Sequence, residues 1–213
     1  MASTRAMRWL LGALLATSGC ASQGVIHGTV TVPRARQAGL GAHAGHAAPK
    51  AGPQDAIVYL EKVPDKVEAT LARAPQAAVV AQENHRFVPR VVPVVAGSTV
   101  RFENRDRVYH NVFSVAPTKR FDVGKYAPGK FKEVRFDSAG VIQLFCDIDP
   151  AMSGYVVVLP HHAFARPDAM GAFTLPRLPR GTYTVKVWHP NLGRLSRKVE
   201  MPKRGDAQVD LRY

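Results

Sequence analysis

Cysteine is scarce in this chain, with only two in 213 residues. Cys20 falls near the start, directly after a stretch with the features of an export signal, so Cys146 has no second thiol for an intramolecular disulfide. A single thiol in an oxidising compartment indicates metal ligation, intermolecular pairing or reactivity. The absence of a partner therefore directs attention to the residues around Cys146.

Long apolar runs are also absent, apart from a short one at the start. Arg5 and Arg8 precede the apolar residues 9–16, and small residues then lead to Cys20. This run is shorter than the roughly 20 apolar residues that span a bilayer, and its layout is that of a bacterial export signal over residues 1–19. We expect Cys20 to be the lipidated residue of a periplasmic lipoprotein anchored to the outer membrane. Ordinary signal cleavage, without lipidation, is the alternative.

Several functional motifs are missing. There is no Ser-His-Asp order with a nucleophile elbow, no phosphate-cradling glycine loop and no His-Glu-x-x-His, so the chain is not expected to be an enzyme. Nucleic-acid-binding motifs are missing too. The formal net charge is +13, and loss of Arg5 and Arg8 with the signal leaves +11. A basic exported protein attracts anionic lipid headgroups or an acidic redox partner.

Helical periodicity is nearly absent after the signal. Short β-branched and aromatic runs recur between glycine and proline, a pattern that predicts an all-β sandwich fold. We expect strands near 24–32, 56–61, 78–82, 92–96, 99–103, 110–115, 132–137, 141–146, 154–159, 172–176, 182–188 and 196–201.

The chain divides into a central segment and two flanking ones. Residues 168–188 contain a Gly-x-Phe turn at Phe173, then alternating apolar positions up to Trp188. With the early strands, they resemble the small transthyretin-like sandwich modules related to the carboxypeptidase regulatory domain. We expect residues 24–65 and 166–213 to form one discontinuous sandwich around an inserted domain at 77–159. His43 and His46 lie in an Ala/Gly/Pro-rich loop and are incidental or a weak metal site.

The residues after the apolar run 141–145 have the spacing of a metal-binding loop. Cys146 and Met152 supply a thiolate and a thioether, and His110 arrives from an earlier strand. A strand-end cysteine followed by a turn lets positions three and six residues later meet the same ion, and Pro150 stiffens that turn. Sulfur and imidazole donors in this combination are preferred by copper.

At this point a family resemblance is visible. Residues 77–159 resemble a cupredoxin, the family of plastocyanin, azurin and amicyanin, and of the cupredoxin-type proteins found with methylamine utilisation. The resemblance implies a Greek-key β-sandwich, one copper ion held by His110, Cys146, position 149 and Met152, and single-electron transfer to a partner protein. It also implies a supporting role for Asn111 beside the sulfur and a dry shell that we place at Phe113, Phe145 and Tyr155.

Asp149 departs from the family pattern, which has histidine there. A carboxylate is a harder ligand than imidazole, and it favours Cu(II). Four outcomes stay open: an altered red or type-2 copper site, replacement by another imidazole (His85, His161 or His162), a different metal, or a vestigial site. Asp149 can also be a turn residue that caps backbone amides. His189, after Trp188, is interpreted as packing or a turn.

Three functions therefore remain. The first is a membrane-tethered copper protein that passes single electrons between larger partners. The second is a metal-free structural or adaptor lipoprotein that keeps the cupredoxin fold. The third is copper sequestration or delivery. Cys146 alone would be a buried structural thiol, so the joint spacing of Cys146, His110 and Met152 is what favours the first.

Overall fold

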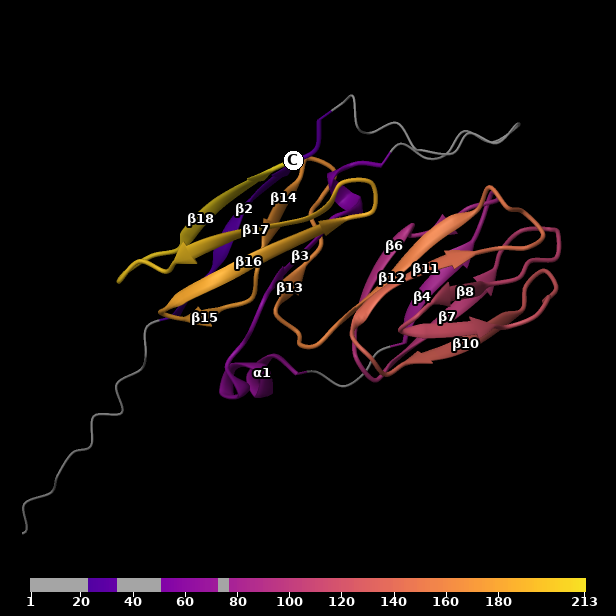
Figure 1. The fold of residues 1–213 in the computed structure, drawn as a ribbon, viewed down its shortest axis with the longest axis horizontal. Helices are drawn as coiled ribbons and strands as arrows, with labels where there is room; N and C mark the ends of the chain where they lie inside the picture. Colours follow the sequence, from indigo (N-terminus) through magenta and orange to yellow (C-terminus); the bar gives the residue numbers. More distant parts are fainter. Residues whose placement is uncertain (1–22, 34–50, 73–76) are drawn as a thin grey trace, which may run out of the picture.

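The computed structural model describes residues 23–33, 51–72 and 77–213. The predicted signal, Cys20, His43 and His46 lie outside these residues. Within them, the strands form two β-sandwiches that lie side by side (Figure 1). We call the one built from β4 to β12 the central sandwich and the other, built from strands on both sides of it in sequence, the flanking sandwich.

The central sandwich contains two sheets, with strand orders β10-β7-β4-β5 and β6-β12-β11-β8-β9. Most neighbours are antiparallel, but β4 with β7 and β6 with β12 are parallel. Alternate side chains from both sheets point inward and bury an apolar core that includes Cys146 and Met152. The strands are β4 (Ala78–Gln82), β5 (Phe87–Val88), β6 (Val91–Val95), β7 (Ser98–Asn104), β8 (Phe113–Ala116), β9 (Lys119–Asp122), β10 (Phe131–Phe136), β11 (Gly140–Phe145) and β12 (Ser153–Leu159).

The flanking sandwich takes its strands from both sides of the central one. Its sheets have the orders β13-β3-β16-β17 and β14-β2-β18, with a small β1-β15 pair beside them. β2 and β18 are parallel, and a Cβ on Gly28 would lie 1.8 Å from the Val209 carbonyl oxygen, so this approach requires glycine. The strands are β1 (Gln23–Gly24), β2 (Ile26–Thr31), β3 (Ile57–Leu60), β13 (Phe164–Ala165), β14 (Ala172–Thr174), β15 (Leu178–Pro179), β16 (Thr182–His189), β17 (Gly193–Glu200) and β18 (Ala207–Arg212).

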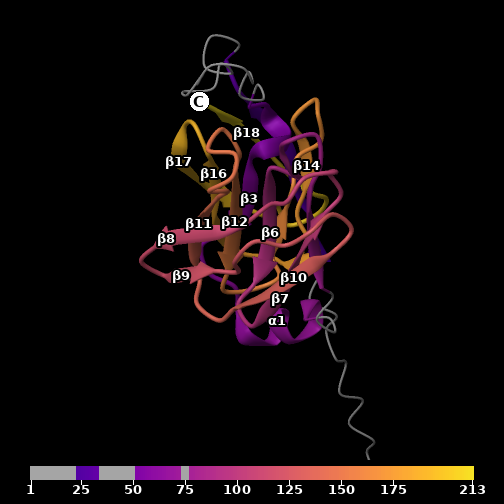
Figure 2. The same cartoon turned by 90° about the vertical axis from the view of Figure 1, so that its right-hand side faces the viewer.

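The two sandwiches share a small buried cluster of Ile57, Val91, Val157, Leu159 and Trp188. The Tyr155 ring, on β12, meets the Trp188 ring edge-on at 5.3 Å between centroids. Beside it, Arg90 of the central sandwich pairs with Asp55 of the flanking one, at 3.6 Å. In Figure 2, turned by 90°, the two sandwiches lie one behind the other along the line of view. Our placement of Tyr155 in the dry shell of the metal site was therefore wrong, because its ring belongs to this contact.

The structure confirms the all-β prediction, and each predicted strand has a counterpart. The described residues also hold a 3-10 turn, Pro53–Asp55, and a short helix, α1 (Asp65–Leu71), which we did not predict. The predicted strand at 110–115 begins later, at Phe113, and His110 makes a single bridge with Tyr126 instead. Which segments fold independently stays a prediction. No helix in the described part of the chain is long and apolar enough to cross a membrane.

Candidate metal centre

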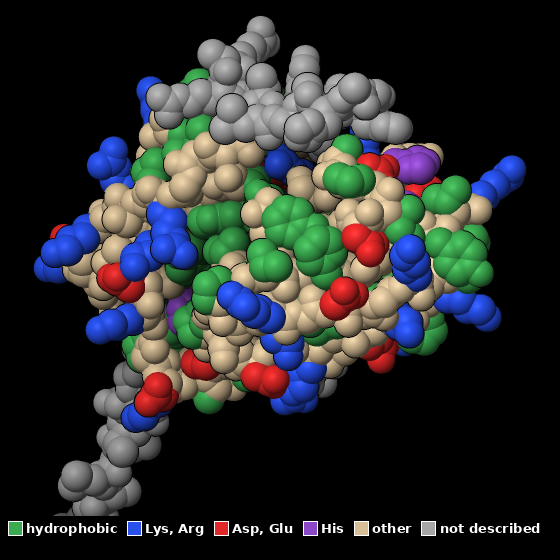
Figure 3. Space-filling model, turned by 45° about the vertical axis from the view of Figure 1, so that its right-hand side comes forward, with side chains coloured by type: hydrophobic (Ala, Val, Ile, Leu, Met, Phe, Trp, Pro, Cys, Tyr) green, Lys and Arg blue, Asp and Glu red, His purple; other side chains and the backbone are tan. Residues whose placement is uncertain are grey.

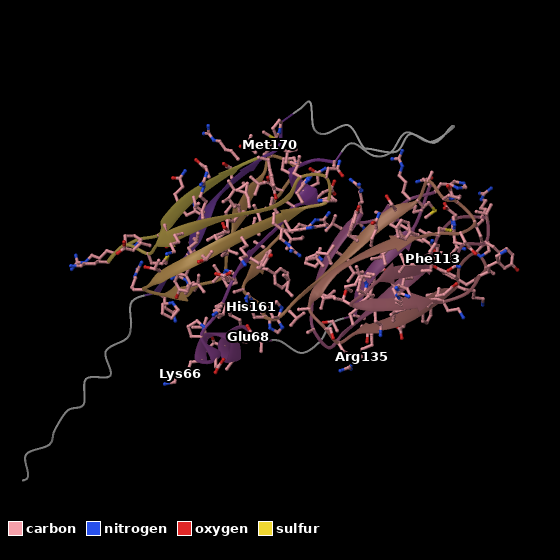
Figure 4. The ribbon with its side chains drawn as sticks, viewed as in Figure 1. Lys66, Glu68, Phe113, Arg135, His161 and Met170 are labelled. Atoms are coloured by element: carbon pink, nitrogen blue, oxygen red, sulfur yellow. The ribbon has the colours of Figure 1, made fainter. Side chains whose placement is uncertain are left out.

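Strand pairing brings the segments that carry Cys146 and Met152 to one end of the central sandwich. Phe145, the last residue of β11, pairs with both Ser153 of β12 and Phe113 of β8. Cys146 and Met152 directly follow and precede these paired positions. Figure 4 places Phe113 in the sandwich away from His161 and Glu68, so this end is remote from α1 and the flanking sandwich.

Cys146 and His110 face each other in the core. The distance from Cys146 Sγ to His110 Nδ1 is 3.7 Å, and exposure is 2% for Cys146, 0% for His110 and 2% for Met152. With bonds of about 2.3 Å to sulfur and about 2.0 Å to nitrogen, an angle near 120° separates two donor atoms on one ion by about 3.7 Å. The observed spacing therefore fits a transition ion between thiolate and imidazole.

Asp106 fixes the ring of His110 from the other side. Its Oδ2 lies 2.8 Å from His110 Nε2, and its two oxygens also accept the backbone N–H groups of Asn84, at 2.7 Å, and His85, at 3.0 Å. Burial raises the pKa of Asp106, but hydrogen bonds from the His85 backbone, the His110 ring and the Asn84 backbone outweigh burial and lower that pKa. A carboxylate on the far nitrogen of a metal-binding histidine sets its orientation.

Sequence reasoning missed Asp106. The available signal was its position four residues before His110, but the spacing alone does not show that residues 106–110 form a turn which brings the two side chains together. The structure adds that the same carboxylate also holds the turn between β4 and β5. Asp106 therefore connects two separate segments of the site.

Asp149 makes contacts of its own. Its Oδ1 accepts the Ala151 N–H at 3.1 Å, its carbonyl oxygen accepts the Met152 N–H at 3.0 Å, and its Oδ2 lies 2.9 Å from His85 Nδ1. This is the turn arrangement that we considered as the alternative to coordination. Within the described residues, no group of three or more His, Cys, Asp and Glu side chains is placed to hold a metal ion. Coordination by Asp149 stays a prediction, with partners already on both carboxylate oxygens.

Of the three histidines considered as replacements, His85 lies at the site. Its ring centroid is 5.9 Å from that of His110, at an interplanar angle of 82°. His161 instead bonds to the Leu60 carbonyl, and His162 pairs with Glu68 of α1. His161, and Glu68 with which His162 pairs, lie beside the flanking sandwich and far from Phe113 in the view of Figure 4. Of these three histidines, His85 alone lies near His110.

A buried polar network supports the site from β4. The Gln82 amide donates to the Asn111 carbonyl at 2.9 Å, and the Tyr126 hydroxyl donates to Gln82 Oε1. Burial, and after it the charge of Cys146, raises the pKa of Tyr126, which therefore stays protonated. Asn111 is tied to β4 through its backbone, while its Oδ1 is buried without a hydrogen-bond partner. Its donation toward the sulfur stays a prediction.

Comparison with solved structures identifies proteins similar to parts of this chain. A Cu(I) form of an amicyanin mutant is 28% identical, covers 41% of this chain and 86% of that one, and gives a TM-score of 0.38. A purple cupredoxin from Nitrosopumilus maritimus is 24% identical over 38% of this chain and 99% of that one, with a TM-score of 0.35. A Cu-containing nitrite reductase from Thermus scotoductus SA-01 is 19% identical over 62% of this chain and 28% of that one, with a TM-score of 0.39.

No protein-family model matches the chain, and no curated protein matches it. All three TM-scores are below 0.5, so we base the interpretation of the site on its own residues and distances. These define a buried thiol, imidazole and thioether at one end of an all-β sandwich.

Proposed function

We propose that the chain is an exported copper-binding protein of the cupredoxin type that transfers single electrons, with an altered ligand set. The observation that carries this proposal is the 3.7 Å spacing of Cys146 Sγ and His110 Nδ1, with Met152 buried in the same apolar core as Cys146. Copper bound there would supply a one-electron Cu(II)/Cu(I) couple. The fourth ligand that we propose is Asp149, which lies in the loop between Cys146 and Met152.

The role of the protein is to hold the donor side chains in fixed positions and to exclude water from them. Asp106 fixes the His110 ring, and the turn between β11 and β12 fixes the Cys146 and Met152 backbones. Burial of these side chains excludes water. A set of donors that cannot rearrange keeps the geometry similar in both oxidation states and limits the reorganisation needed for electron transfer.

The partner we propose is an acidic redox protein in the periplasm, with the chain anchored to the outer membrane through Cys20. The full sequence has a net charge of +13, and the +11 that remains after loss of Arg5 and Arg8 supports attraction to an acidic surface. On the face drawn in Figure 3, Lys and Arg side chains are spread over the surface and mixed with Asp and Glu. The charge therefore favours long-range steering over a single basic docking patch.

A metal-free adaptor is the second candidate. It is favoured by one observation: the described residues contain no preassembled group of three His, Cys, Asp or Glu donors. Copper sequestration or delivery is the third candidate function. It would use the same Cys146 and His110, but it would not require a defined reduction potential for the bound copper.

Titration of Cu(II) into the mature chain separates these functions. We expect an intense thiolate-to-copper absorption band and a Cu(II) electron paramagnetic resonance (EPR) signal, with the band lost in Cys146→Ser and kept in His162→Gln. Absence of the band in the unmodified protein would favour the adaptor. Reversible voltammetry of the loaded protein would then distinguish an electron carrier from a copper store.

A further inference from the structure

We propose that the end of the flanking sandwich around the turn between β17 and β18 binds anionic phospholipid headgroups and turns the Cys146 end away from the bilayer. This inference rests on the anchor at Cys20 in the proposed function, and it names the surface that the anchor brings to the membrane. We call Arg177, which precedes β15, and Lys203 and Arg204, in the turn between β17 and β18, the basic tip.

The turn between β17 and β18 is fixed to β1, where the described part of the chain begins. The Arg180 guanidinium donates to the carbonyl oxygens of Gln23 and of Gly205, which lies in that turn. The Val25 N–H donates to Asp206 Oδ1 at 2.9 Å. The position of the turn relative to Gln23 is therefore set by the fold.

The two segments are also in close contact. A Cβ on Gly24 would lie 2.7 Å from the Met201 methyl carbon and 2.8 Å from the Gly205 carbonyl oxygen. On its other side, Gly24 pairs with Leu178, the residue that follows Arg177. The segments that carry the basic tip therefore lie beside the same short strand.

The chain limits the distance between the anchor and the basic tip. Cys20 stands three positions before Gln23, and three fully extended residues span at most roughly 11 Å. The Debye length is about 10 Å at an ionic strength of about 0.1 M. A lipid at Cys20 would therefore hold β1, and the basic tip beside it, within the range over which a charged bilayer attracts fixed charges.

The charges of the basic tip are available to a ligand. Its three side chains are exposed, and none of them forms an ion pair with another residue that the structure describes. With Arg180, they oppose four positive charges to the two negative charges of Glu200 and Asp206 at the ends of the turn. Each Lys or Arg close to an anionic membrane strengthens binding about five-fold. An acidic protein is the alternative ligand, and the nearby anchor favours the bilayer over it.

The arrangement of the two sandwiches gives this contact a consequence for the metal centre. In Figure 1, β15 and the turn between β17 and β18 lie at the end of the flanking sandwich that faces away from the central one. Phe113, which pairs with the residue before Cys146, lies in the central sandwich at the opposite side of Figure 4. A bilayer at the basic tip would therefore leave the Cys146 end open to a soluble redox partner.

The test measures binding of the mature chain, carrying Cys20→Ser and so without the lipid, to phosphatidylcholine vesicles with and without phosphatidylglycerol. We expect binding only to the vesicles that contain phosphatidylglycerol, and release as salt is added. Lys203→Gln combined with Arg204→Gln should weaken this binding about thirty-fold. Lys130→Gln combined with Lys132→Gln removes the same charge from exposed side chains at β10 and is the matched control, with an expected change of less than about two-fold.

No binding to the phosphatidylglycerol vesicles, or equal losses in the two double variants, would overturn the inference. Binding of the basic tip to polyglutamate but not to vesicles would assign it to an acidic protein and overturn it as well. Labelling of the exported protein with a radioactive fatty acid tests the anchor separately. Label on Cys20 without vesicle binding by the tip would keep the anchor and remove this surface, whereas vesicle binding by the tip without label would support the surface and overturn the anchor.

Discussion

Both sandwiches bury histidines, but the partners of the ring nitrogens differ. In the flanking sandwich, His189 Nδ1 accepts the Asn191 N–H at 3.3 Å and its Nε2 donates to the Gly52 carbonyl at 3.2 Å. His161, at the junction, has the same pattern with Ala163 and Leu60. In the central sandwich, His110 faces a thiol and a carboxylate.

This difference separates structural histidines from candidate ligands. A ring whose two nitrogens are matched by backbone groups has no lone pair to give, because the accepting nitrogen is already used. His110 keeps one nitrogen toward a soft, weakly bonding sulfur. Burial alone does not distinguish them, since His189 and His110 are both fully buried.

The largest effect we expect is at the contact between the sandwiches. Trp188→Ala removes the ring that packs on Tyr155, and loss of a buried Trp costs about 3–5 kcal/mol. The flanking sandwich should then unfold at lower urea concentration than the central one, as followed by circular dichroism. Met170→Ala, at a side chain that is 85% exposed, is the control. A single unshifted transition would mean that the contact contributes little.

A smaller effect tests the two kinds of histidine directly. His189→Leu leaves the Gly52 carbonyl and the Asn191 N–H without partners in the interior, at a cost of about 1–3 kcal/mol. His110→Leu, measured without copper, removes the bond to Asp106 but should cost less than His189→Leu, because Asp106 keeps two backbone donors and some exposure to water, and the thiol loses only a weak bond. Urea unfolding of both variants gives the comparison. Equal losses would contradict the distinction drawn above.

The smallest effect is a pH dependence. Burial, and after it the charge of Arg90, lowers the pKa of His189 below its ordinary value of 6.5, against the opposing contributions of Gly52 and Asp55. Below pH 6.5 the unfolded chain therefore binds a proton that the folded chain does not, and stability falls by at most about 1.4 kcal/mol per pH unit.

Urea midpoints measured from pH 7 to pH 5 test this slope, and His189→Leu should flatten it. The lowered pKa of Asp106 affects folding stability in a separate pH range. Its stabilising contribution is lost only as the pH falls below the ordinary pKa of that carboxyl, 3.8. A slope that is unchanged in His189→Leu would assign the effect to another group.

The features that could be predicted from the sequence are those set by residues close together in the chain. Strand alternation located the sheets, and the spacing of Cys146 and Met152 predicted a loop that closes at one end of them. β18 was missed although Ala207, Val209 and Leu211 alternate, and α1 was missed because it is short and buries only Val67.

The contacts of His85 could not be predicted, because they depend on how the two central sheets pack. His85 and Asp149 are 64 residues apart, and neither a periodicity nor a motif connects them. Asp106 and the turn at Asn84 lie at the end of one sheet, but they are 22 residues apart, and no motif connects this side chain to that backbone. Such contacts follow from the three-dimensional arrangement alone.

The parallel pairing of β2 with β18 has a consequence for biogenesis. β2 and β18 are separated by about 175 residues, so this sheet cannot close before β18 has been made. Residues 78–159 form a contiguous block whose pairings are all internal. Because domains generally fold as units, we expect the central sandwich, which carries the thiol, to fold before the flanking sandwich is complete.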